Sequence, residues 1–197
     1  MNFDVSFRTL IIAPLEAASG LRLFSVNYWL LDFEEQFFHL DTPNESGIFA
    51  ISLLFEGIAI DISPAWDRIH RDESNHHYIQ APRVPIDNRS GELAFAERLL
   101  KIPADRTMIW RDAINDQLIG AEVSGDNHTP QAIRLLFPSA TVIISLGYSG
   151  DELYIGDGDE LLVFSDEQWR LQVQRMMRPM NNIWACRIAK KSGIDSL

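Results

Sequence analysis

The second half of the chain consists of short apolar runs, each closed by turn-forming residues. Residues 132–137 end at Pro138-Ser139, residues 141–146 end at Gly147, and residues 152–155 end at the run 156–159, Gly-Asp-Gly-Asp. Runs of about four to eight apolar residues between Gly, Pro and Asp are typical of β-strands joined by tight turns. Turn-forming residues at this spacing favour a fold made mainly of antiparallel sheet.

The first part of the chain shows the same β signals. Residues 21–31 alternate between apolar and polar side chains for most of their length, as a half-buried strand does. Residues 48–55 and 58–62 flank Glu56-Gly57, a pair that suits either a tight turn or a bulge within one long strand. We also expect β structure over residues 5–12.

Helical signals are few. We expect a short helix over residues 91–101, which Pro103 ends, and a longer one that begins at Asp166 and closes before Pro179. Residues 107–110 and 117–123 have the composition of strands, with a turn or short helix over 111–116 between them. Residues 161–164 form a further apolar strand, and 182–191 a weaker element in the tail.

These elements predict one α+β domain over residues 1–197, mostly antiparallel β-sheet with a few short helices. With 197 residues, of which 46% are hydrophobic, the chain can bury a substantial core. Within this domain, the polar composition of residues 67–90 indicates a loop or insertion, and residues 170–197 form a basic C-terminal tail that we expect to be helical.

The charge is strongly one-sided. The net charge is −11; residues 1–169 hold 27 acidic and 11 basic side chains, whereas residues 170–197 hold one acidic and six basic side chains. An acidic surface disfavours non-specific nucleic-acid and anionic-membrane binding. No apolar run approaches the roughly 20 residues of a membrane helix, and the single cysteine, Cys186, makes no internal disulfide. We therefore expect a cytoplasmic protein that binds neither membrane nor nucleic acid.

The acidic side chains concentrate in one stretch. Between Leu135 and Trp169 the chain has seven acids and no Lys or Arg. Five of them surround the apolar runs 153–155 and 161–164, which we expect to form a β-hairpin: Asp151, Glu152, Asp157, Asp159 and Glu160. Such a charged hairpin either keeps the sheet soluble and protects its edge, or offers a docking face to a cationic partner.

Two patterns raise the question of metal binding. Asp157-Gly158-Asp159 begins like an oxygen-rich calcium loop, but the glycine and the later ligands of an EF-hand are missing. The loop from His70 to His77 holds three histidines and two acids without the spacing of a zinc site. We expect the first segment to be a turn whose side chains hydrogen-bond its own backbone, and the second to be a solvent-exposed loop. We therefore expect no metal and no cofactor.

Catalytic signatures are weak. Ser149 lies in Gly-Tyr-Ser-Gly, one residue short of a nucleophile elbow, and no phosphate-binding glycine loop is present. We assign no catalytic residue, although a hydrolase using paired carboxylates or a metal stays open as an alternative. Among the five tryptophans, Trp66 precedes the polar loop and is the one we expect to face outward as an interface anchor.

The order of the strands and acids over residues 133–164 resembles the C-terminal hairpins of small acidic bacterial immunity proteins, which neutralise polymorphic or contact-delivered toxins. The matching segments are Ile133–Phe137, Thr141–Tyr148, Asp151–Leu153 and Asp159–Phe164. The resemblance implies a non-enzymatic cytoplasmic protein that occludes the active site of a basic toxin, for example a nuclease. A regulatory interaction module with another cationic protein partner is a further alternative, and the oligomeric state stays open.

Overall fold

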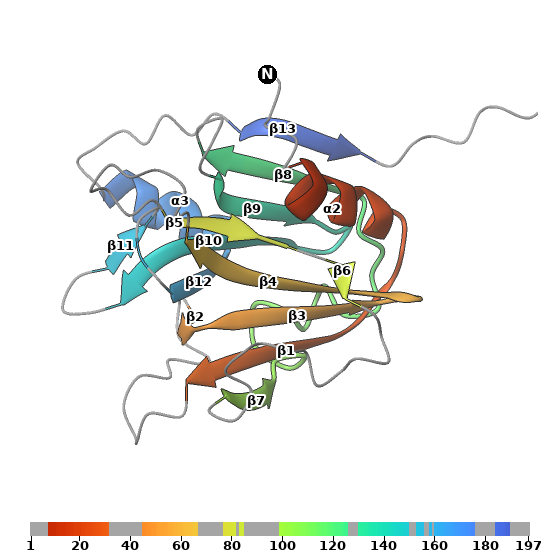
Figure 1. Ribbon diagram of the computed structural model, residues 1–197, viewed down its shortest axis with the longest axis horizontal. Coiled ribbons are helices and arrows are strands. Elements are labelled where there is room, and N and C mark those ends of the chain that lie inside the picture. Colours follow the sequence, from red (N-terminus) through yellow and green to blue (C-terminus); the bar gives the residue numbers. More distant parts are fainter. Residues whose placement is uncertain are drawn as a thin grey trace, which may run out of the picture.

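The protein folds into two packed antiparallel sheets with short helices, which confirms the expected α+β class (Figure 1). The computed structural model describes residues 8–31, 45–66, 77–81, 83–84, 99–125, 130–149, 153–155, 158, 160–175 and 184–189. Side chains at the ends of some of these segments, including Trp66 and all of 184–189, lie outside that description.

The first sheet has the strand order β5-β4-β3-β1-β7, and β6 also pairs with β4. Its strands are β1 (Leu23–Leu31), β3 (Ala50–Phe55), β4 (Ile58–Trp66), β5 (His77–Gln80), β6 (Arg83–Val84) and β7 (Leu99–Pro103). Strands β3 and β4 form a hairpin with Phe55 opposite Ile58, and Glu56-Gly57 is the two-residue turn between them. Gly57 has a φ of 81°, which a side chain would disfavour.

The second sheet has the order β13-β8-β9-β10-β12-β2, and β11 also pairs with β10. Its strands are β2 (Glu45–Ile48), β8 (Gly120–Gly125), β9 (Pro130–Leu136), β10 (Thr141–Ser149), β11 (Leu153–Ile155), β12 (Glu160–Ser165) and β13 (Trp184–Ala189). The strands expected at 132–137, 141–146, 152–155 and 161–164 therefore exist, with small shifts in their ends.

The two sheets are joined at two corners where the chain passes from one to the other. On one side β2 pairs with β12 and the next residues continue as β3 between β1 and β4. On the other side Gln117 bridges to Arg22, and the same segment continues as β8 in the second sheet. Backbone hydrogen bonds of 2.9 Å from Leu23 to Asp116 and from Leu118 to Leu21 hold this second corner.

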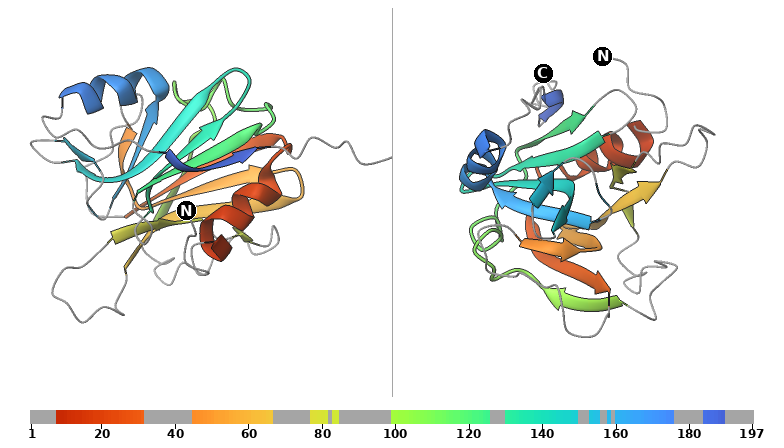
Figure 2. Two further views of the ribbon diagram at one scale, coloured as in Figure 1. Left: turned by 90° about the horizontal axis from the view of Figure 1, so that it is seen from above. Right: turned by 90° about the vertical axis from the view of Figure 1, so that its left-hand side faces the viewer.

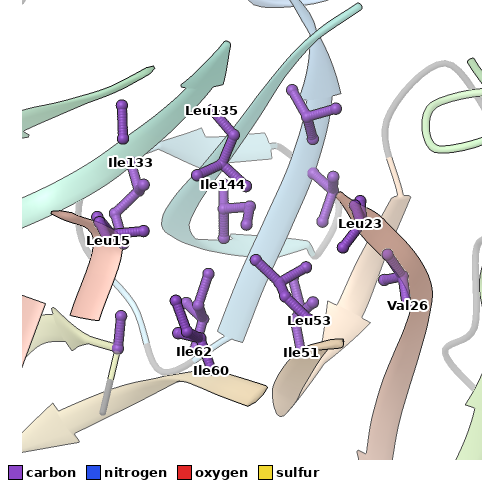
Figure 3. Close-up of a cluster of buried hydrophobic side chains, with 14 of the residues drawn as sticks. Leu15, Leu23, Val26, Ile51, Leu53, Ile60, Ile62, Ile133, Leu135 and Ile144 are labelled. Carbon is purple, nitrogen blue, oxygen red and sulfur yellow. The ribbon is translucent and has the colours of Figure 1, made fainter. Parts of the chain in front are cut away.

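The core fills the space between the sheets. Ile51, Leu53, Ile60 and Ile62 from the first sheet point toward Ile144 and its neighbours from the second, and all are fully buried (Figure 3). Alternation places these residues on one face of each strand. At about 25 cal/mol per Å² of apolar area, this burial is the main stabilising term of the fold.

Residues 8–18 are helical, so the strand expected over 5–12 is wrong for its described part. A π-helical turn, η1 (Arg8–Ile12), leads into α2 (Ala13–Ala18), which lies against β4, β8 and β13 beside the two sheets (Figures 1 and 2). The fully buried Leu15 and Ala18, with Ile11 at 1% exposure, follow the spacing of one helical face. That helical spacing, which continues past residue 12, outweighs the short local alternation before it.

The helix α3 (Asp166–Arg175) begins at the residue that the sequence predicts, and it packs on β12 and β10 at the outer face of the second sheet. Trp169 packs edge-on against Phe164, with ring centres 5.5 Å apart, and is 2% exposed. Arg134 pairs with Glu122 at 3.0 Å and with Asp166 at 3.6 Å, linking the helix to β9 and β8.

Four further local expectations are corrected. Residues 99–101, expected at the end of a helix, belong to strand β7, and residues 107–110 form turns instead of a strand. Residues 184–189, expected in a helical tail, form β13 on β8. Pairing with an available sheet edge supplies backbone hydrogen bonds that isolated propensity does not anticipate. Residues 77–80 and 83–84, within the expected loop, form β5 and β6.

Candidate functional site

Of the five acids of the predicted site, only Glu160 lies within the described residues. Asp151, Glu152, Asp157 and Asp159 lie outside the described residues, whereas Glu160 is the first residue of β12, half-buried and opposite Gly147. In sequence, residues 150–152 lie between β10 and β11 and residues 156–159 between β11 and β12; β11 pairs with residues 147–149 of β10, and the first residue of β12 with Gly147. Trp66 is the last residue of β4, opposite His77 in the register of β5; its side chain is not described.

The strands around these acids do not form the expected hairpin. Strands β11 and β12 both run antiparallel to β10, with Gly147 opposite Ile155 in one pairing and Glu160 in the other. Two strands antiparallel to a third run parallel to each other, so they cannot be the two arms of one hairpin. The hairpin is instead made by β10 and β11, with Ser149 opposite Leu153.

Gly158 marks a close approach of this segment to β10. A Cβ atom on Gly158 would lie 2.0 Å from the carbonyl oxygen of Gly147, and the φ of Gly158 is 149°. Both facts require glycine here, because neither the space nor the backbone conformation accepts a side chain. The Asp157-Gly158-Asp159 motif therefore owes its glycine to packing on β10.

Most residues of the two suggested metal sites lie outside the described residues. This applies to His70, Asp72, Glu73 and His76, and His77 is placed only by its backbone in β5. Within the described ranges, no three His, Cys, Asp or Glu side chains are grouped to hold a metal ion.

A row of polar side chains crosses the outer face of the first sheet. Trp29 on β1 donates its indole N–H to Ser52 Oγ on β3 at 2.7 Å, and Ser52 donates its hydroxyl to Asp61 Oδ1 on β4 at 2.5 Å. The register explains the contact, since Ser52 is directly opposite Asp61 and diagonal to Trp29. The alternation of β1 places its neighbours Tyr28 and Leu30 on the inner face, where both are fully buried.

A cation completes this row. Lys101, opposite Trp29 on the edge strand β7, holds its Nζ 5.6 Å from the centre of the indole ring. Burial raises the pKa of the Asp61 carboxyl above its usual value, while the Ser52 hydrogen bond and the charge of Lys101 act in the opposite direction. We name the set of Trp29, Ser52, Asp61 and Lys101 the outer-face row.

A second polar group lies inside the core. Tyr28 donates its hydroxyl to the carboxylate of Glu45 and accepts a hydrogen bond from the indole N–H of Trp110; all three residues are fully buried. Burial and the adjacent Glu45 carboxylate raise the pKa of Tyr28 well above its usual value. The group ties β1 to the first residue of β2 and to the turn segment 104–116, so its geometry fits an internal brace.

Sequence reasoning missed both polar groups. The alternation of apolar and polar residues over 21–31 does predict that Tyr28 and Trp29 lie on opposite faces of the sheet. No local pattern marks Glu45, Asp61 or Lys101, because their partners are distant in sequence and meet only through strand pairing.

Comparison of the chain with protein-family models, with curated proteins and with solved structures finds no match. None of the described helices is long and apolar enough to cross a lipid bilayer.

Proposed function

We propose that this protein is a non-enzymatic binding protein whose acidic residues around the end of β10 dock onto a cationic protein partner. The observation that carries the proposal is the charge of residues 136–168, which hold seven acids and no base. An acidic surface of this kind attracts a basic partner over about a Debye length and accelerates encounter.

The arrangement of strands supports a single docking surface. The two connections that contain Asp151, Glu152, Asp157 and Asp159 both adjoin residues paired with 147–149 of β10. Glu160 follows directly, at the start of β12.

More specifically, we propose that the protein is a cytoplasmic immunity protein that occludes the basic active site of a cognate toxin, for example a nuclease. The resemblance of residues 133–164 to such proteins motivates this form. Acidic side chains that face a nuclease cleft mimic the charge of phosphates, which gives such a complex both speed and specificity.

The test is a charge reversal with a matched control. Asp157→Lys, Asp159→Lys and Glu160→Lys are combined in one variant. A control variant combines Glu16→Lys, Glu56→Lys and Asp112→Lys, three exposed acids elsewhere, and changes the net charge equally. Binding is measured by surface plasmon resonance, at low and high salt, to the C-terminal domain of a toxin encoded beside the gene.

We expect the first variant to lower the association rate by about tenfold or more and the control variant to lower it far less. Equal loss in both variants would mean that net charge alone drives binding. Unchanged binding in the first variant would refute the acidic docking surface.

A further inference from the structure

The outer-face row combines an aromatic face, a carboxylate and a cation in one fixed arrangement. Lys101 Nζ lies 5.6 Å from the centre of the Trp29 ring, within the distance of about 6 Å at which the negative face of an indole attracts a cation. The ring therefore already holds an ammonium group supplied by the chain itself.

The indole has a fixed orientation. Its N–H is bound to Ser52 Oγ at 2.7 Å, and the same hydroxyl is bound to Asp61 Oδ1 at 2.5 Å. Two hydrogen bonds therefore connect the edge of the ring to the carboxylate across three neighbouring strands. A site whose groups are held in place before binding loses little conformational freedom when a ligand arrives.

The favourable contacts of the Asp61 carboxylate do not fully offset the cost of burying its charge. Burial disfavours the charged form of Asp61 more than Ser52 and Lys101 together favour it, so its pKa is raised. A cation placed closer than Lys101 would therefore lower the energy of the ionised carboxylate.

The ammonium group of Lys101 can readily be displaced from the Trp29 ring by another cation. Lys101 is exposed, at the centre of the edge strand β7, and its side chain is long and flexible. An exposed ammonium–indole contact is weak, so a ligand that displaces Lys101 loses only about two- to fivefold in affinity to this competition.

We propose that Trp29 and Asp61 form a site for an ammonium or guanidinium group of a protein partner, and that in the free protein Lys101 lies over the Trp29 ring of this site. This inference rests on the proposed function only in taking the cation to be a side chain of the cationic protein partner. It assigns the partner a second contact, on the sheet opposite to the one that carries the acidic residues.

The test uses butylammonium chloride as the probe and the Trp29 indole N–H resonance in ¹⁵N-labelled protein as the readout. Trp29→Phe assigns that resonance among the five tryptophans. Sodium chloride at equal ionic strength controls for screening. The proteins are the unaltered chain, Lys101→Ala, Lys101→Ala with Asp61→Asn, and Arg111→Ala, which removes an exposed cation elsewhere.

We expect a saturable shift of the resonance in the millimolar range, about two- to fivefold tighter in Lys101→Ala than in the unaltered chain or in Arg111→Ala. Adding Asp61→Asn should abolish the saturation. Lys101→Gln replaces Lys101→Ala if the smaller side chain disturbs β7.

A response no larger than that to sodium chloride, or one that Asp61→Asn leaves unchanged, would overturn the site. The titration contains no protein partner, so its outcome is independent of the charge-reversal experiment. Loss of toxin binding without loss of probe binding would refute the proposed function and leave the site standing.

Discussion

Removing the hydroxyl of Tyr28 tests whether the buried polar group braces the fold. In Tyr28→Phe, Glu45 loses a hydrogen bond and the indole N–H of Trp110 loses its acceptor, and both side chains are fully buried. A hydrogen bond to a charged group contributes about 1.5–3 kcal/mol, and a buried donor left without its acceptor costs about 1–3 kcal/mol. We expect the free energy of unfolding to fall by about 3–5 kcal/mol.

The assay is urea unfolding followed by tryptophan fluorescence and circular dichroism, with the slope m as a check that both proteins unfold alike. The control is Ser145→Ala, which removes a fully buried hydroxyl that donates to the backbone carbonyl of Leu146 at 3.0 Å. This control should cost about 1 kcal/mol. If Tyr28→Phe costs no more than the control, the interpretation as a brace is wrong.

The pH dependence gives an independent check. Because the pKa of Tyr28 is raised in the folded protein, its contribution is complete below about pH 10, the usual pKa of tyrosine, and is lost as the pH rises toward the folded value. The difference in stability between the unaltered chain and Tyr28→Phe should shrink above pH 10 by about 1.4 kcal/mol per pH unit. A constant difference up to pH 11 would contradict the assigned environment of the phenol.

Three further substitutions probe separate parts of the fold. Gly158→Ala should destabilise by about 2–3 kcal/mol in urea unfolding, through its overlap with β10, whereas Gly57→Ala, with nothing within 4 Å, should cost only about 1–2 kcal/mol of backbone strain; equal costs would contradict the close approach. Trp169→Ala should cost about 3–5 kcal/mol in the same assay and the half-exposed Leu171→Ala less than about 0.5 kcal/mol; a small effect at Trp169 would mean that α3 is not anchored by it. Asp61→Asn should raise the melting temperature at pH 7, because the raised pKa of Asp61 makes its ionised form unfavourable, and this gain should disappear below about pH 3.8; a lower melting temperature at pH 7 would reverse the sign of that argument.

Local sequence was sufficient where hydrophobic pattern and turn residues agreed. Glu56-Gly57 and the apolar runs on either side of it predicted either two strands joined by a tight turn or one long strand with a bulge, and the structure shows the β3–β4 hairpin. The helix that begins at Asp166 was predicted from its start and stop signals, since Asp166 precedes a segment with apolar side chains that closes before Pro179.

Local sequence failed where a segment gains most from a distant neighbour. Residues 99–101 and 184–189 were expected in helical segments, yet each pairs with the open edge of a sheet. The prediction of a hairpin in the acidic segment was wrong for another reason. The two apolar runs of this segment looked like hairpin arms, but each instead pairs with β10 in the same direction.

The sequence by itself determined the class of fold and the concentration of acidic charge in residues 136–168, because periodicity, turn chemistry and charge are local properties. Only the tertiary structure decided which side chains meet. Strand register brings Trp29, Ser52 and Asp61 into one row and encloses Tyr28, Glu45 and Trp110 in the core. Register depends on the packing of whole strands, so no short segment of the chain encodes it.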